Sequence, residues 1–265
     1  MTIAAGFLCV DGIVLCADSQ HTGSMTKFDQ KKIIEIPGKD GSWLVITGAG
    51  YDNYIAMAVD SLEERFEKCS SNFSAIKDII KETITEIYEQ HIWKFPSGWD
   101  VPTIELLVAA RLASGEVRLW QTAFTSVSTC RQSAFIGMGA EIAQGLASWI
   151  YPNNGGYWRM TQIIAKEILA ETKRISKECG GMTHVCSIPV GNEGIRGVEV
   201  RTDSEFFGNL NYLLGRVLRS VLDKRDNEST FQGELKIFEE QMQKMRDLAQ
   251  DLPDGREWLM MFHRI

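Results

Sequence analysis

The sequence lacks several features that mark common classes of protein. No apolar stretch approaches the roughly 20 residues that a membrane-spanning helix needs, and the first residues lack the basic region and cleavage site of a secretory signal. The 28 Lys and Arg residues are outnumbered by 35 Asp and Glu residues, and no basic stripe typical of nucleic-acid binding is present. These absences predict a cytoplasmic protein with no membrane and no nucleic acid among its partners.

Patterns of metal-ligating residues are also missing. The six cysteines include no C-x-x-C pair, and the four histidines show no metal spacing. We therefore expect reduced, mostly buried thiols, and neither a metal site nor a cofactor. What is present is a chain of 265 residues, 44% of them hydrophobic, which is enough for one large domain, with or without an appendage.

The order of the predicted elements indicates the fold class. β-prone or alternating runs predict strands at residues 2–8, 13–17, 32–36, 43–47, 103–112, 116–124, 132–136, 182–188 and 194–201. Apolar residues spaced by three and four predict helices at residues 55–66, 76–87, 140–149 and 160–178. Hairpins thus alternate with helix pairs, which argues against a doubly wound parallel sheet. We predict an α+β fold, a four-layer αββα sandwich of two antiparallel sheets between helix layers.

The last sixty residues differ from the rest of the chain. A charged break, DKRDNE at residues 223–228, precedes a capping box, STFQ at 229–232. An apolar stripe follows at three- and four-residue spacing, formed by Phe231, Leu235, Phe238, Met242 and Met245. We predict a domain of residues 2–203 and a C-terminal helical extension of residues 204–265. The stripe fits a helix folded onto its own chain and a contact with a neighbouring subunit equally well.

Four motifs near the N-terminus occur in a distinctive order. They are TIAAG at residues 2–6, DGIVLCADS at 11–19, KKIIEI at 31–36 and TGAG at 47–50. Together they resemble the opening of a proteasome β-type subunit, an N-terminal nucleophile (Ntn) hydrolase, and weaker similarities extend to about residue 201. The resemblance implies the αββα fold and a threonine-type peptidase without a cofactor. It also implies a peptide or unfolded protein as substrate and a self-assembled homo-oligomer, and it indicates no particular ATPase or regulator.

The chemistry of such an enzyme begins at Thr2, which becomes the N-terminal residue once Met1 is removed. A threonine hydroxyl is a weak nucleophile, but the free α-amine, with an ordinary pKa of about 7.7–8.0, can accept its proton. The resemblance assigns the nearby cation to Lys32, held by Asp18. We expect Thr2→Ala and Lys32→Ala to abolish peptide hydrolysis and to leave the thermal transition nearly unchanged.

The substrate-binding assignments also rest on the resemblance. Gly48 corresponds to the residue whose backbone N–H binds the oxyanion, where the missing side chain lets the substrate come close. Ile46 corresponds to the floor of an apolar specificity pocket, and Gly50 joins it in the substrate-binding set. The alternative for the two glycines is a turn that simply enters a helix.

Some positions favour other interpretations. Thr2 can simply begin a strand, Asp18 can cap a turn, and Lys31 or Lys32 can be a solvated strand residue. Met138 stands where the family has a serine, and Ser176, or Ile175 in a second alignment, stands where it has an aspartate. These departures support an alternative function, a catalytically silent structural or ring-forming subunit.

Overall fold

The computed structural model describes residues 2–9, 12–22, 27–68, 72–96, 99, 101–150, 162–191 and 195–200. Strands in antiparallel sheets and four α-helices make up most of these residues. The predicted mixed α/β class with antiparallel sheets is therefore confirmed. The predicted C-terminal helical extension, residues 204–265, lies outside the described residues, and so does the boundary at residue 203.

The first sheet has five antiparallel strands. Their spatial order is β10 (Ser133–Gly137), β1 (Ile3–Cys9), β2 (Gly12–Asp18), β11 (Thr183–Pro189) and β12 (Arg196–Val200). β1 and β2 form the predicted hairpin, with Ala4 opposite Ala17 and Cys9 opposite Gly12. Asp18 ends β2, and its register partner on β11 is Thr183.

The second sheet is a five-stranded meander. Its strands are β5 (Ile33–Pro37), β6 (Trp43–Gly50), β7 (Ile104–Arg111), β8 (Val117–Ala123) and β9 (Ser126–Thr129). A short ribbon of β3 (Gln20–Thr22) and β4 (Lys27–Asp29) lies in the sequence between β2 and β5. The sequence patterns did not predict β3, β4 or β9, which have only three or four residues each and are too short to show a period.

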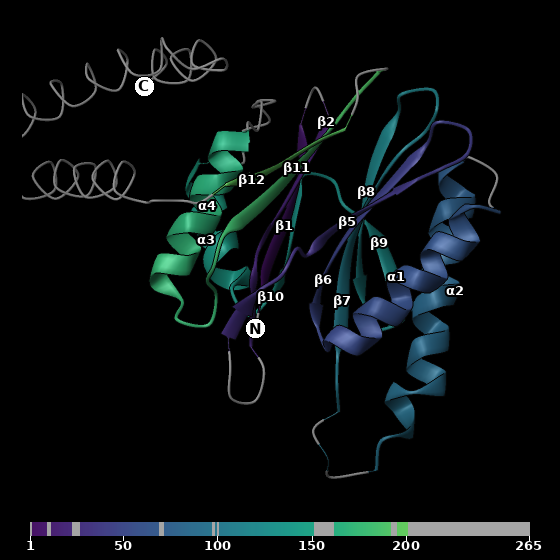
Figure 1. Cartoon of the computed structure of the whole chain (residues 1–265), viewed down its shortest axis with the longest axis horizontal. Helices are drawn as coiled ribbons and strands as arrows, with labels where there is room; N and C mark the ends of the chain where they lie inside the picture. The colour runs from purple at the N-terminus through teal and green to yellow at the C-terminus, as the bar shows by residue number, and fades with distance from the viewer. Residues whose placement is uncertain are drawn as a thin grey trace, which may run out of the picture. The chain divides into compact units, whose positions relative to one another are not determined.

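Each sheet is covered by a pair of helices. α1 (Asp52–Phe66) and α2 (Phe73–Gln90) contact the second sheet, whereas α3 (Ala140–Ile150) and α4 (Gln162–Ile175) contact the first (Figure 1). The buried stripe of α2 includes Ile76, Ile80 and Ile84, as the spacing predicts, and the side chain of Asn72 caps its first turn. No helix in the described part of the chain is long and apolar enough to cross a membrane.

Strand alternation separates two buried clusters. On β6, Leu44 and Ile46 join the cluster between the second sheet and its helices. Val45 and Ala49, which point the other way, join a cluster that also contains residues of β1, β2 and β11. The two sheets therefore pack face to face, and the residues at the edge of that contact become available for a site.

Candidate active site

Three of the predicted site residues come together where the two sheets meet. Thr2 directly precedes β1, Asp18 ends β2, and Lys32 directly precedes β5 of the other sheet. The ammonium of Lys32 donates to Thr2 Oγ1 at 2.8 Å, to Asp18 Oδ1 at 2.8 Å and to the Gln20 carbonyl oxygen at 2.6 Å. The threonine hydroxyl therefore lies in direct contact with a cation held by a carboxylate.

The carboxylate of Asp18 is fully buried and has several donors. Oδ1 accepts the Ile3 N–H at 3.2 Å in addition to the Lys32 ammonium, and Oδ2 accepts the Gly180 N–H at 3.1 Å. Burial of a charge is costly unless such partners compensate it. The donors come from β1, from the approach to β5 and from the loop before β11, so Asp18 fixes three segments around Thr2.

The burial of this ion pair changes one expectation. The side chain of Lys32 is only 5% exposed and that of Asp18 is fully buried. Removing one partner of a buried pair leaves the other charge uncompensated, which typically costs about 3–5 kcal/mol. Lys32→Ala should therefore lower the thermal transition, contrary to the expectation from sequence, because Lys32 stabilises the fold as well as the site.

The structure gives a different reason for the glycine at position 48. A Cβ at Gly48 would lie 2.8 Å from Ile55 Cγ2 and 3.0 Å from Leu106 Cδ2, so the missing side chain makes room for α1. Ile46 is fully buried in the cluster beneath the helices and does not line the pocket described next. The structure therefore does not bring Ile46 together with Thr2.

A pocket of about 510 Å³ opens beside Thr2. Gly50 lines it, with φ of +120°, and a Cβ there would lie 2.0 Å from the Thr103 carbonyl oxygen, so only glycine fits. Gly137 also lines it, and a Cβ at that position would lie 2.3 Å from the carbonyl oxygen of Thr2. The glycines at the ends of β6 and β10 thus allow close backbone packing around Thr2 and the pocket.

The two positions that depart from the resemblance hold Met138 and Ser176. Met138 is 64% exposed at the pocket, and the Ser176 hydroxyl accepts the Glu178 N–H at 3.3 Å. A residue that the sequence did not single out lies closer to the network. Lys173, in the last turn of α4, donates to the Gly181 carbonyl oxygen at 2.9 Å and to Thr183 Oγ1 at 2.7 Å. The only sequence signal for it was a basic residue at the end of a helix.

Four of the described cysteines are poor rival nucleophiles. Burial raises the pKa of the Cys16 and Cys179 thiols, and it raises that of Cys186 to about 12 and that of Cys130 to about 11. The thiolate is the reactive form, so these residues stay protonated near neutral pH. Among the described residues, no group of three or more His, Cys, Asp or Glu side chains is arranged to hold a metal ion.

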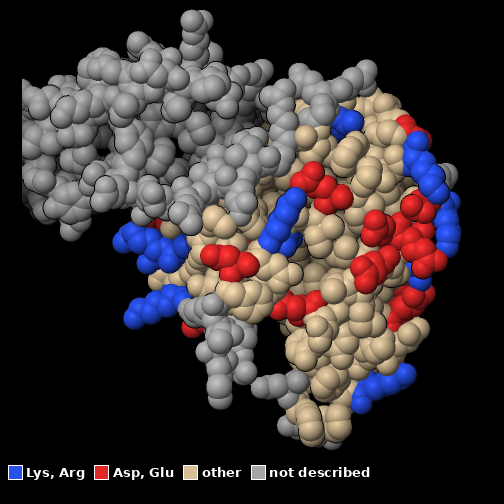
Figure 2. Space-filling model, in the orientation of Figure 1, with Lys and Arg blue, Asp and Glu red and all other residues tan. Residues whose placement is uncertain are grey.

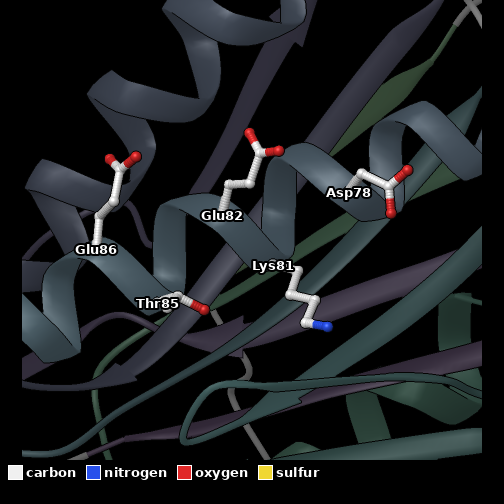
Figure 3. A pocket seen from close by; sticks show the side chains of 5 residues that line it. All are labelled: Asp78, Lys81, Glu82, Thr85 and Glu86. Atoms are coloured by element: carbon white, nitrogen blue, oxygen red, sulfur yellow. The ribbon is translucent and has the colours of Figure 1, made fainter.

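A second hollow lies on the outer surface of α2 (Figure 3). Asp78, Glu82 and Glu86 follow one another at four-residue spacing along its rim, and Lys81 and Thr85 complete it. Figure 2 shows acidic side chains gathered on that side of the molecule. Arg65 pairs with both Glu82 and Glu86, so much of this charge is already neutralised within the helix pair.

Comparisons with known proteins support the fold and nothing finer. No family model matches the chain, and no curated protein matches it. Three similar solved structures are Anbu proteins. The Gly-1 mutant of Anbu from Hyphomicrobium sp. strain MC1 shares 16% identity at a TM-score of 0.68, over 86% of this chain and 99% of that one. A helical assembly of the Anbu complex from Pseudomonas aeruginosa has 14% sequence identity and a TM-score of 0.65, and the match covers 86% of this chain and 99% of that one. Anbu from Yersinia bercovieri, which is described as an ancestral beta-subunit, has 16% sequence identity and a TM-score of 0.65, and the match covers 85% of this chain and 98% of that one.

These findings correct the resemblance stated from the sequence. The identification as a proteasome β-type subunit-like Ntn hydrolase was wrong: the similar structures are Anbu proteins, only distant relations of proteasome subunits, and no family model or curated relative supports it. At 14–16% identity the likeness shows an Anbu-like fold alone. Any activity has to be argued from the geometry of the site.

Proposed function

We propose that the chain is a threonine-type amide or peptide-bond hydrolase whose nucleophile is the hydroxyl of Thr2, exposed by removal of Met1. The observation that carries the proposal is the 2.8 Å hydrogen bond from the Lys32 ammonium to Thr2 Oγ1, with Asp18 behind it. Burying an ion pair carries a large desolvation penalty, which orienting the hydroxyl of a residue with only a structural role would not require. Its presence beside an open pocket is typical of a site in which charge develops on that oxygen.

The proposed reaction uses two functional groups of one residue. The α-amine of Thr2 takes the hydroxyl proton as Oγ1 attacks the substrate carbonyl, and the Lys32 ammonium stabilises the negative charge on Oγ1. The tetrahedral intermediate collapses by breaking the C–N bond, and the proton passes from the α-ammonium to the leaving amine. Water then attacks the ester, the α-amine accepts its proton, and Thr2 regains its hydroxyl as the acid leaves.

The backbone around β6 supports a role for Gly48 and Gly50 in holding the substrate. The paired residues of β5 and β6 end at Ile33 and Thr47, so β6 continues through Gly48 to Gly50 beyond the end of β5. An extended peptide could add its main chain along this free strand edge. In the proposed site the Gly48 N–H binds the oxyanion, and Gly50 leaves room for the substrate at the pocket.

The proposal also covers the domain organisation, the oligomeric state, the substrate and the location of the protein. It treats residues 2–203 as the catalytic domain and residues 204–265 as an extension. The proposed architecture of the domain is a four-layer αββα sandwich. Its support is the packing of α1 and α2 on one sheet and of α3 and α4 on the other. A homo-oligomer is supported by the assembly described for the Pseudomonas aeruginosa Anbu. A peptide or unfolded protein as substrate, and a cytoplasmic location, stay predictions.

The test combines processing with labelling. Intact mass of the protein from its native host should lack the mass of Met1. A peptide electrophile that closes a ring with both the hydroxyl and the α-amine should then label Thr2 in stoichiometric amount. Thr2→Ala should remove labelling and the turnover of fluorogenic peptides. Retained Met1 throughout, or full turnover in Thr2→Ala, would overturn the mechanism.

One observation favours a second candidate, a catalytically silent structural subunit. The side chain at position 138 is an exposed methionine, and neither Ile175 nor Ser176 can supply a carboxylate. Altered surroundings of this kind can leave a site with its shape but without turnover. Protein proven to begin at Thr2 that neither labels nor hydrolyses any amide would establish this alternative.

A further inference from the structure

One side chain of the pocket beside Thr2 has no role in the proposed reaction. Glu105, the second residue of β7, is the only carboxylate among the residues that line this pocket. Its register partner on β6 is Ala49, which also lines the pocket, and both belong to the row that faces the other sheet. The Gly137 N–H donates to Glu105 Oε2 at 3.2 Å. A negative charge is therefore held at the pocket wall by a strand end that packs on Thr2.

Two large apolar side chains also line the pocket. Phe124 and Met138 line it, and each is 64% exposed. Phe124 lies in the turn between β8 and β9 with φ of +51°, a conformation that is uncommon for a bulky residue and costs about 1–3 kcal/mol. Its ring contacts the ring of Tyr88 at 6.1 Å between centroids. An exposed aromatic side chain on a strained backbone at the wall of a pocket is typical of a binding surface.

The phenol of Tyr88 also faces this charge. It accepts the Ile104 N–H and donates to the Ile104 carbonyl oxygen, at 3.4 and 3.3 Å. Burial raises its pKa, and the nearby carboxylate of Glu105 raises it further. Tyr88 is thus a neutral hydrogen-bonding group near Glu105, and none of the lining residues is a lysine or an arginine.

We infer that this pocket binds the side chain of a lysine or arginine residue of the substrate. The long aliphatic stem of such a side chain would pack on Phe124 and Met138, and its cationic end would meet Glu105. Lysine and arginine are the side chains that combine a long apolar stem with a positive end. The inference deepens the proposed hydrolase function and rests on it for the measurement of turnover, but its binding measurement does not need turnover.

The experiment compares lysine with norleucine, which has the same stem without the ammonium. Internally quenched peptides carry one or the other at each position around the scissile bond, and kcat/KM is measured for the wild type and for Glu105→Gln. At one position the wild type should prefer lysine about tenfold, which is the size of a charge-assisted hydrogen bond. Glu105→Gln should bring the lysine-to-norleucine ratio near one, and its amide oxygen can still accept the Gly137 N–H, so the contact with the end of β10 is kept.

Two variants serve as controls. Glu116→Gln removes a carboxylate near the opposite end of β8, and it should leave the ratio unchanged. Phe124→Ala should lower kcat/KM for both peptides alike, because both stems lose the same contact. If Glu105→Gln fails to fold, the test uses the salt dependence of the lysine-to-norleucine ratio of the wild type instead. Added salt should then weaken the lysine preference and leave norleucine turnover unchanged.

Peptide binding to the Thr2→Ala variant separates the pocket proposal from the hydrolase proposal. It is measured by the fluorescence anisotropy of unquenched peptides. Lysine-dependent binding that Glu105→Gln removes, without hydrolysis by the wild type, would support the pocket and overturn the hydrolase. Hydrolysis without a lysine preference at any position would overturn the pocket and leave the hydrolase standing. A lysine preference that persists in Glu105→Gln would likewise overturn the assignment to Glu105.

Discussion

At the scale of single residues, the site depends on one buried ion pair that connects the two sheets. Lys32 directly precedes β5 of the second sheet, whereas Asp18 ends β2 of the first sheet and Thr2 directly precedes β1 of that sheet. The ammonium donates to both. The same contact that orients the hydroxyl therefore also fixes how one sheet meets the other, and a change at Lys32 has two consequences.

We predict that Lys32→Met lowers kcat/KM for a fluorogenic peptide by at least about a thousandfold, because no cation then stabilises the charge on Thr2 Oγ1. The free energy of unfolding should fall by about 3–5 kcal/mol, because Asp18 is left buried without its cation. Steady-state kinetics and urea unfolding measure the two effects. Lys31→Met is the matched control: the Lys31 side chain is 65% exposed and forms a surface ion pair with Glu35, so both quantities should hardly change.

A double variant separates the two consequences. Asp18→Asn combined with Lys32→Met removes the uncompensated charge, so part of the lost stability should return without any activity. Recovery of activity together with stability would mean that Lys32 acts on the fold alone, and it would remove the main support for the proposed mechanism.

The resemblance, and not the hydrophobic pattern, placed Thr2, Asp18 and Lys32 in one site, and the structure brings the three into hydrogen-bond contact. The pattern alone marks the strand ends where they lie and does not show that these ends meet. The reason for Gly48 could not be predicted, since it depends on the distance to Ile55 on α1, which no local pattern contains. The structure does not place Ile46 at the pocket beside Thr2, and here the reason is a local pattern. Strand alternation points its side chain toward the helices, on the other side of the sheet from Val45 and Ala49.

At the scale of elements, α4 is tied to β11 by a half-buried lysine. Lys173 donates to Gly181 and Thr183, and Thr183 is the register partner of Asp18. The Gly180 N–H in the same loop donates to Asp18. The end of α4 thus supports the loop that completes the site. This contact was not predictable, because the sequence does not show how the chain turns from α4 into β11.

We predict a pH-dependent difference in stability between the wild type and Lys173→Met. Burial lowers the pKa of Lys173 from its ordinary value of 10.5, despite the opposing effect of Asp18 and Asp29. Between the lowered native pKa and 10.5, the unfolded chain binds more protons at this residue than the native chain. The wild type should therefore gain stability relative to Lys173→Met as the pH rises through that window.

Urea unfolding of both proteins from pH 7 to pH 10.5 measures this difference, and titrations common to both cancel. Arg174→Met is a suitable control, since Arg174 is exposed and pairs within its own helix with Glu171. A difference between wild type and Lys173→Met that is flat with pH, or that falls as the pH rises, would contradict the prediction.

At the scale of the whole molecule, periodicity predicts the helices because each helix buries one face, whereas the strands are recognised by their β-prone composition, since the strands of both sheets have buried residues on both faces. These sequence patterns do not predict which apolar side chains stay exposed on the folded chain. Two tryptophans, Trp93 and Trp99, lie in the segment between α2 and β7 and are 57% and 68% exposed. Large aromatic side chains exposed close together in sequence are typical of surfaces that another protein covers.

We predict that the full chain forms a homo-oligomer in which this segment is buried. Light scattering at micromolar concentration should give a mass several times the 29.8 kDa of one chain. Trp93→Ser combined with Trp99→Ser should shift the protein toward the monomer, because each buried tryptophan contributes strongly to an interface. Phe28→Ser, which changes a 51% exposed aromatic residue on β4, is the control and should leave the mass unchanged. A stable monomer of the wild type would refute the assembly, and an unchanged oligomer in the double variant would place the interface elsewhere on the chain.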